Sequence, residues 1–221
     1  MLNKMFYLIG DIHGHFQKLS HLVDKIKKYL TLDDSLVFLG DYIDRGYQSF
    51  EVIDYLVSLK DDYNTIILKG NHEDMFLNYL KGYDVSIFMY NGGHATIQSY
   101  EETIGSLKLP QAHKNFFNSL KLYYETEDFI AVHAGLRQGT SLQQQSEHDL
   151  LWIREEFYQK QYTWDKTVIF GHTATFNITA LPIYEVYDDK KKNIIGIDTG
   201  AAYGGPLTCL RMPDRQIFQS Y

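Results

Sequence analysis

The chain has 221 residues, of which 44% are hydrophobic and 15% aromatic. This length and composition suit one globular α/β domain spanning residues 1–221 and exclude an intrinsically disordered chain. The formal net charge is -7, from 21 basic and 28 acidic side chains, which argues against a general nucleic-acid-binding protein because phosphate backbones require a basic surface.

The cysteine count and the apolar runs indicate the compartment. The single cysteine, Cys209, excludes an internal disulfide and fits a reducing environment. The apolar start, Met1–Gly10, is too short for a signal peptide, and Asp11 follows it without a cleavage site. No apolar run approaches the roughly 20 residues that span a bilayer. We therefore expect a cytoplasmic protein that binds no membrane.

Three strand–loop–helix units follow one another in the first 80 residues. Each starts with a short apolar run typical of a buried strand and continues into apolar residues at helical spacing. This order predicts a mostly parallel sheet with right-handed crossovers. The predicted strands are 5–9, 35–39 and 65–68, and the predicted helices are 16–30, 50–59 and 73–80.

The rest of the chain is less regular, with no linker or repeat. Helices are predicted near 94–101 and 110–120, and another at 149–158 after a polar loop at 138–145. Strands are predicted at 129–132, 168–170, 194–197 and 207–210, with a solvated hairpin tip at 190–192.

Five apolar runs end in glycine or another small residue beside a potential metal ligand. A lone histidine after a strand is usually structural, and aspartate after glycine is usually turn chemistry. However, polar groups at the end of an apolar run cost stability unless they have partners, and parallel strands bring such ends to one sheet edge. The recurrence therefore favours one shared site. The candidate ligands are Asp11, His13, Asp41, Asn71, His133 and His172.

These candidate ligands offer oxygen and nitrogen but no thiolate. Such a set suits Mn²⁺, iron or Zn²⁺ and not a sulfur-ligated ion. Six ligands are too many for one ion with an open position, and they fit two ions bridged by a shared carboxylate and a water or hydroxide. We expect two divalent ions, with Mn²⁺ preferred and Fe²⁺ or Fe³⁺, Zn²⁺, Ni²⁺ and Co²⁺ as alternatives.

The blocks Gly10–Gly14, Gly40–Gly46 and Gly70–Glu73 resemble, in order and spacing, those of the phosphoprotein phosphatase branch of the calcineurin-like metallophosphoesterases. The segments His133–Gly135 and Gly171–His172 resemble the family's remaining metal histidines. The resemblance covers essentially the whole chain and is strongest to compact bacterial and phage members. It implies an α/β metallophosphoesterase fold, with mixed β-sheets in a central sandwich flanked by helices.

The resemblance also implies the role of each matching residue. A metal-bridging hydroxide would attack phosphorus directly, and His72 would be the general acid that protonates the leaving oxygen. Asp44 would hydrogen-bond His72, holding its tautomer and raising its pKa. The implied ligands are Asp11, His13 and Asp41 for the first ion, and Asn71, His133 and His172 for the second, with Asp41 as the bridge.

Four residues are implied to contact the substrate. Arg45 and Arg154 match the phosphate-clamping arginines, whose guanidinium forks fit phosphoryl oxygens. Arg154 rests on a shorter match and is otherwise an exposed helix arginine. Asn71 would contact substrate as well as metal, and Tyr203 falls where the family places an aromatic over the site or is a packing residue. The other histidines, His15, His21, His94, His113 and His148, match no metal block and are interpreted as surface or helix residues.

Two substrate classes remain open. The preferred hypothesis is hydrolysis of phosphoserine or phosphothreonine in proteins, with phosphotyrosine and small phosphoesters also accepted. The alternative is symmetrical cleavage of diadenosine tetraphosphate to two ADP, because residues 198–210 resemble the tail of such enzymes. Against it, those enzymes are usually longer, commonly lack the equivalent of Asp44 and often have aspartate at the position of Glu73. A monomer is expected, with a phosphorylated protein or a dinucleotide as its partner.

A third hypothesis, from another class, is a non-catalytic metal-binding or scaffold domain. Its sign would be loss of His72 or of a bridging ligand, and every such position is intact.

Overall fold

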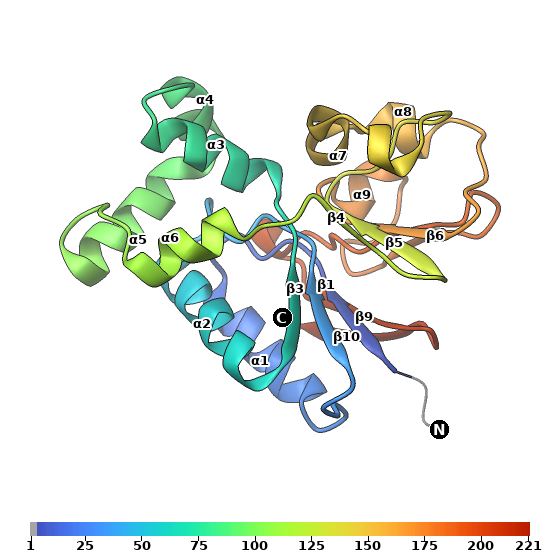
Figure 1. The fold of residues 1–221 in the computed structure, drawn as a ribbon, viewed down its shortest axis with the longest axis horizontal. Coiled ribbons are helices and arrows are strands. Elements are labelled where there is room, and N and C mark those ends of the chain that lie inside the picture. The colour runs from blue at the N-terminus through green and yellow to red at the C-terminus, as the bar shows by residue number, and fades with distance from the viewer. Residues whose placement is uncertain (1–3) are drawn as a thin grey trace.

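The computed structural model describes residues 4–221, so the first three residues of the apolar start lie outside the described part. The described strands form two five-stranded sheets, ordered β10-β9-β1-β2-β3 and β4-β5-β6-β8-β7 (Figure 1). The strands are β1 (Phe6–Ile9), β2 (Ser35–Phe38), β3 (Asn64–Ile67), β4 (Tyr123–Glu125), β5 (Phe129–Val132), β6 (Thr167–Phe170), β7 (Tyr187–Asp189), β8 (Ile194–Gly196), β9 (Leu207–Met212) and β10 (Gln216–Ser220).

Helices cover the outer faces of both sheets. In Figure 1, α1 and α2 lie on one side of the first sheet, and α7 and α8 lie beside the second. The α-helices are α1 (Phe16–Ile26), α2 (Ser49–Asp62), α3 (Asn71–Leu80), α4 (Val85–Phe88), α5 (His94–Ile104), α6 (Gln111–Asn118), α7 (Glu147–Trp152), α8 (Glu155–Tyr158) and α9 (Thr175–Ile178). A π-helical turn, Met89–Gly93, joins α4 to α5.

The three predicted strand–loop–helix units are confirmed. Strand β2 pairs in parallel with both β1 and β3, and the helices α1, α2 and α3 follow these strands in turn. The sheet is mixed because β9 pairs antiparallel with β1, and β10 with β9. The second sheet is also mixed, with β5, β6 and β8 parallel and with β4 and β7 antiparallel at its edges.

The two sheets pack on each other through alternate residues of their strands. Leu8 and Val37 of the first sheet share one buried cluster with Ile169 and Ile195 of the second. The intervening residues of the first sheet, such as Tyr7, point the other way and join the cluster beneath the helices. Because both faces are covered, these strands are apolar throughout instead of alternating with polar residues. This packing fixes the carboxyl ends of both sets of parallel strands.

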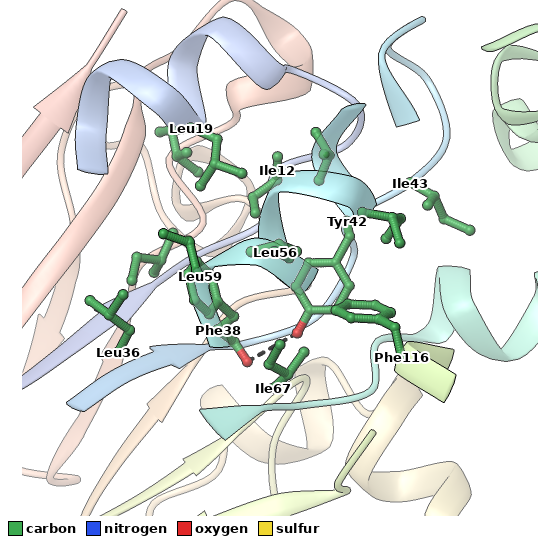
Figure 2. Close-up of a cluster of buried hydrophobic side chains, with 14 of the residues drawn as sticks. Ile12, Leu19, Leu36, Phe38, Tyr42, Ile43, Leu56, Leu59, Ile67 and Phe116 are labelled. Carbon is green, nitrogen blue, oxygen red and sulfur yellow. Dashed lines mark hydrogen bonds between the residues drawn. The ribbon is translucent and has the colours of Figure 1, made fainter. Parts of the chain in front are cut away.

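Tyr42 anchors the loop after β2 in the core. Its hydroxyl donates to the carbonyl of Leu68 at 2.6 Å and lies 3.2 Å from that of Phe38. Its ring packs edge-on against Phe116 of α6, with 5.6 Å between ring centroids. Figure 2 shows the tyrosine among these apolar side chains. The neighbouring residue, Asp41, is thereby held at the end of the strand.

One predicted helix is interrupted in the structure. The helix expected at 149–158 is two helices, α7 and α8, because Arg154 between them has non-helical angles (φ -131°, ψ -103°). The hairpin tip expected at 190–192 is confirmed between β7 and β8. Among residues 4–221, no helix has both the length and the apolar character needed to cross a membrane.

Candidate active site

Five candidate site residues have a left-handed backbone. The φ angles are 48° for His13, 53° for Asp41, 71° for Asp44, 69° for Arg45 and 61° for His172. Residues other than glycine rarely adopt this conformation, which costs free energy and is concentrated at functional sites. This strain lies in the loops that follow β1, β2 and β6.

Two of the loops cross in close contact. The amide of Gly46 donates to the carbonyl of His13 at 3.0 Å, and the amide of Gly14 donates to the carbonyl of Tyr42 at 2.8 Å. A Cβ atom on either Gly14 or Gly46 would collide with the backbone of the opposite loop. Both glycines are therefore required for the approach that brings the loops after β1 and β2 together.

Asp41 lies at the centre of the candidate ligands. One of its oxygens, Oδ1, accepts the backbone amide of His72 at 3.0 Å and lies 3.3 Å from Nε2 of His133. The other, Oδ2, lies 3.6 Å from Nε2 of His13 and 3.8 Å from Nε2 of His72. This carboxylate therefore faces both halves of the site, as the proposed bridging ligand would have to do.

Backbone carbonyls fix the tautomer of two histidines. Nδ1 of His13 lies 3.0 Å from the carbonyl of Ile43, and Nδ1 of His133 lies 2.9 Å from that of Leu39. We assign the proton to Nδ1 in both rings, since a carbonyl can only accept. Each Nε2 lone pair then faces Asp41, which is the arrangement that metal-binding histidines adopt.

The side-chain oxygen of Asn71 contacts both His133 and His172. Its Oδ1 lies 2.9 Å from Nε2 of His133 and 2.8 Å from Nδ1 of His172. The carboxylate of Asp11 accepts the backbone amide of His172 at 2.9 and 3.1 Å. The six predicted ligands are thus linked to one another through direct contacts, although they come from five loops.

The donor set fits divalent ions. The groups His13–Asp41–His72 and Asp41–His133–His172 each offer ligand atoms within 4.8 Å of one another. Burial lowers the pKa of His13, His133 and His172, which favours the neutral imidazole that binds metal. Nε2 of His172 is buried without a hydrogen-bond partner in the described part of the chain, and buried polar atoms normally have one.

The first of these groups differs from the predicted assignment in one member. It contains His72 where the family resemblance implies Asp11 as the third ligand. The carboxylate of Asp11 is instead directed at the amide of His172, and burial together with the charges of Asp198 and Asp41 raises its pKa well above the ordinary value. A divalent ion would offset the repulsion among these buried carboxylates.

His72 and Asp44 form a buried pair. Nδ1 of His72 lies 2.7 Å from Oδ2 of Asp44, and neither side chain is more than 1% exposed. Burial alone would lower the pKa of His72, but the Asp41 carboxylate and the hydrogen bond to Asp44 outweigh it and raise the pKa. The pair is therefore suited to holding a proton near neutral pH.

The guanidinium of Arg45 contacts two histidines of the site, His13 and His72. Its two terminal nitrogens lie 2.9 Å from Nε2 of His13 and 3.1 Å from Nε2 of His72. Its guanidinium carbon lies 5.4 Å from the ring centre of Tyr203, which is 55% exposed and stands edge-on to Phe176. A guanidinium fork and an exposed aromatic ring thus share one side of the site.

Arg154 is held beside His172. It lies between α7 and α8 and is not the exposed helix arginine that was the alternative. Its guanidinium donates to the hydroxyl of Thr173 at 2.8 Å and approaches the carbonyl of His172 at 3.3 Å. All eleven predicted site residues are therefore connected, with Tyr203 joined to the group through Arg45 and Arg154 joined through His172.

Sequence reasoning missed two buried carboxylates at the site. Glu73 accepts the backbone amides of Gly70, Asp41 and Tyr42 at 2.8–3.0 Å, and burial and the Asp41 charge raise its pKa to about 7. Asp198 accepts the amide of Gly200 at 2.9 Å, and burial raises its pKa to about 6. The spacing of Gly70 and Glu73 at the start of α3 was a signal for the first, since glutamate at this position often binds the backbone before a helix.

The comparisons with known proteins agree with this geometry. Residues 5–196 match the family model of the calcineurin-like phosphoesterases. The chain is 28% identical to the asymmetrical bis(5'-nucleosyl)-tetraphosphatase PrpE of Anoxybacillus flavithermus, with 96% of this chain and 92% of the relative covered. It is 23% identical to the symmetrical bis(5'-nucleosyl)-tetraphosphatase of Vibrio campbellii, over 96% and 97% of the two chains.

Solved structures show the same fold. A crystal structure of a putative diadenosine tetraphosphatase superposes with a TM-score of 0.74 at 21% identity, covering 99% of this chain and 93% of that one. A protein serine/threonine phosphatase from Saccharomyces cerevisiae reaches a TM-score of 0.60 at 16% identity, covering 98% and 79%. The family model, which matches most of the chain, and the shared fold together show that this protein belongs to the calcineurin-like phosphoesterase family.

Proposed function

We propose that this protein is a dinuclear metal-dependent phosphoesterase that hydrolyses dinucleoside tetraphosphates. The sequence alone favours phosphoprotein hydrolysis, but we prefer its alternative, dinucleotide hydrolysis. The reason is that two relatives aligned over nearly their whole length are bis(5'-nucleosyl)-tetraphosphatases. The observation in the structure that carries the proposal is the contact of Arg45 with the exposed ring of Tyr203. This contact supports the proposal, because a guanidinium fork can bind phosphate and an exposed aromatic ring beside it can stack on a nucleobase.

Each group of the site has a proposed role. Asp11, His13 and Asp41 would hold one ion, and Asn71, His133 and His172, together with Asp41, would hold the other. When bound, the two ions lower the pKa of a water molecule and neutralise charge on the phosphoryl oxygens. Ligands of nitrogen and oxygen only suit Mn²⁺, iron or Zn²⁺ and not a sulfur-ligated ion, and Mn²⁺ is the metal that we propose.

The reaction forms one bond from a water oxygen to phosphorus and breaks one phosphoanhydride bond. Arg45 and Arg154 orient the phosphoryl oxygens through guanidinium hydrogen bonds. The leaving group is a nucleotide phosphate, which is a stable anion and needs little help from a proton donor. Tyr203 and Asn71 contact the rest of the substrate. The chain thus contributes mainly by binding and orientation.

A second candidate function, hydrolysis of phosphoserine or phosphothreonine in proteins, is favoured by the buried pair of His72 and Asp44. The alkoxide that leaves a phosphomonoester is a strong base, so its departure requires a proton from a group such as His72. This pair would make small phosphomonoesters additional substrates even if the dinucleotide is the main one.

The decisive experiment compares kcat/KM, with Mn²⁺, on diadenosine tetraphosphate and on a phosphothreonine peptide. We expect the dinucleotide to be cleaved more efficiently. Chromatography of the nucleotides then identifies the cleaved bond, since symmetrical attack gives ADP alone and asymmetrical attack gives ATP and AMP. Rapid phosphate release from the peptide with slow dinucleotide cleavage would replace the proposal with the second candidate. The His72→Asn variant serves as the control for contaminating phosphatases in the peptide assay.

A further inference from the structure

Helix α5 contacts the buried pair of His72 and Asp44 on the Asp44 side. Thr96 lies in the first turn of α5, and its side chain is buried against the loop that carries Asp44. Its hydroxyl donates to Oδ1 of Asp44 at 2.5 Å and accepts the backbone amide of Asp44 at 2.9 Å. Both oxygens of Asp44 are therefore engaged, with Oδ1 bound by Thr96 and Oδ2 by His72.

The same segment supports the strained backbone of two site residues. Asp44 and Arg45 have φ angles of 71° and 69°. The hydroxyl of Thr96 accepts a hydrogen bond from the amide of Asp44. The carbonyl of Gly92 accepts one from the amide of Arg45 at 3.2 Å. Residues 92–96 thus hold two consecutive left-handed residues, a conformation that persists only where the surroundings impose it.

Ser49 completes the contacts of Thr96. Its hydroxyl lies 3.2 Å from that of Thr96 and 3.2 Å from the amide of Asp44, and both hydroxyl residues are fully buried. Ser49 begins α2, so the backbone amide of Asp44 is held between the first turns of α2 and α5, and its carboxylate is bound from α5. Ser49 can donate to Thr96, which leaves the proton of Thr96 directed at Asp44.

From these contacts we propose that Thr96 is a positioning residue, which holds Asp44 in the orientation that pairs with His72. The inference rests on the phosphomonoesterase activity proposed for the same site, because it assumes that His72 donates a proton to the leaving group. Within residues 4–221, the side-chain hydrogen bonds of Thr96 go to Asp44 and Ser49 and to none of the proposed metal ligands. Without its hydroxyl, Asp44 loses one of its two side-chain partners and is free to rotate away from the imidazole.

The test compares Thr96→Val, which keeps the shape but removes the hydroxyl, with Thr96→Ser, which retains it. On phenyl phosphate, whose leaving group needs a proton, Thr96→Val should lower kcat by about 10- to 100-fold, the usual loss for a supporting hydrogen-bond partner. On p-nitrophenyl phosphate, whose leaving group is far less basic, the loss should be several-fold smaller. Thr96→Ser should restore most of the kcat on both esters, with little change of KM.

Two controls separate positioning from damage to the fold. Thr103→Val alters the same helix at a hydroxyl that donates to the carbonyl of Ser99, and it should leave both rates unchanged. In the background of His72→Asn, adding Thr96→Val should cause no further loss, since the two residues act through one proton transfer. Equal losses on the two esters, or additive losses in the double variant, would overturn the proposal.

The tautomer of His72 tests the role of Thr96 without any measurement of enzymatic activity. Nitrogen NMR of His72 in the metal-free protein should show the proton on Nδ1 in the wild type and in Thr96→Ser, and a mixed or reversed tautomer in Thr96→Val. An unchanged tautomer in Thr96→Val would count against the role of Thr96. If the wild type cleaves phenyl phosphate but not the dinucleotide, the proposed function fails while the Thr96 test remains valid.

Discussion

Nδ1 of His72 donates to Oδ2 of Asp44 across 2.7 Å, and this contact joins the start of α3 to the loop after β2. Because Nδ1 carries the proton, Nε2 faces the ligand group and lies 3.8 Å from Oδ2 of Asp41. The imidazole of His72 is thus held with Nδ1 bound to the buried carboxylate of Asp44 and with Nε2 facing the candidate metal ligands. The chemistry proposed for His72 depends on this orientation.

The first prediction concerns proton donation. Changing His72→Asn should reduce kcat on phenyl phosphate by a factor on the order of 10²–10⁴, the usual contribution of a general acid or base. The loss on diadenosine tetraphosphate should be smaller, because its leaving phosphate is a weak base. Metal content, measured by mass spectrometry of the purified protein, should stay at the wild-type level. Equal losses on the two substrates would remove His72 from this role.

The second prediction concerns the bridge. Asp41 faces His13 and His133 at 3.3–3.6 Å, so Asp41→Asn should deplete both ions and abolish turnover at low added metal. The metal content of the dialysed protein measures this directly. Asp24→Asn, at an exposed position on α1, is the matched control and should retain the wild-type content. Two ions still bound to Asp41→Asn would show that the proposed ligand assignment is wrong.

The third prediction concerns phosphate binding. Arg45→Ala should raise the inhibition constant of inorganic phosphate about 10- to 100-fold, because hydrogen bonds to charged groups contribute roughly 1.5–3 kcal/mol. Arg45→Lys keeps the charge but not the fork and should recover only part of the affinity. Arg215→Ala, at an exposed position that contacts Asp188, should have no effect. An inhibition constant that does not change in Arg45→Ala argues against the clamp.

The fourth prediction concerns the nucleobase. Tyr203→Ala should raise KM for diadenosine tetraphosphate by about 5- to 100-fold, in line with a base–aromatic stacking contribution of roughly 1–3 kcal/mol. KM for phenyl phosphate, assayed in parallel, should change much less. Tyr203→Phe keeps the ring and should behave like the wild type. If Tyr203 is only a packing residue, both substrates will be affected alike, or neither will be.

The fifth prediction concerns pH and His113, which is buried in α6 and binds the hydroxyl of Tyr100 at 2.8 Å. Burial lowers its pKa below the ordinary value of 6.5, although Asp54 partly opposes the shift. The folded state therefore prefers the neutral ring, and its contribution to stability is complete above pH 6.5 and decreases as the pH falls below that value.

Urea unfolding of the wild type and of His113→Asn at pH 8 and pH 5 measures this dependence. The wild type should lose more free energy of unfolding between the two pH values than the variant does. His21→Asn, at an exposed position on α1, is measured in parallel as the control for replacing a histidine by asparagine. A pH dependence in His113→Asn equal to that of the wild type would contradict the assignment.

Much of the architecture followed from local patterns in the sequence. Apolar runs such as 35–39, with glycine and a polar residue after them, predicted the parallel strands and the edge at which their ends meet. The last two strands were harder to place, because β10 contains polar residues and β9 joins the first sheet by pairing with β1 at the other end of the chain. The break at Arg154 was missed since residues 149–158 are compatible with one helix, and the contacts of Arg154 with Thr173 and His172 lie outside that segment.

The sequence by itself determined which side chains could bind metal and phosphate, because Asp11, Asp41, His72 and Arg45 belong to short blocks whose order and spacing are specific to one family. The tertiary structure decided which atoms of these side chains meet. The carbonyls of Ile43 and Leu39 set the histidine tautomers, and Thr96 fixes Asp44 from a helix 52 residues away in the chain. Such contacts depend on the packing of distant segments, so no local sequence pattern can specify them.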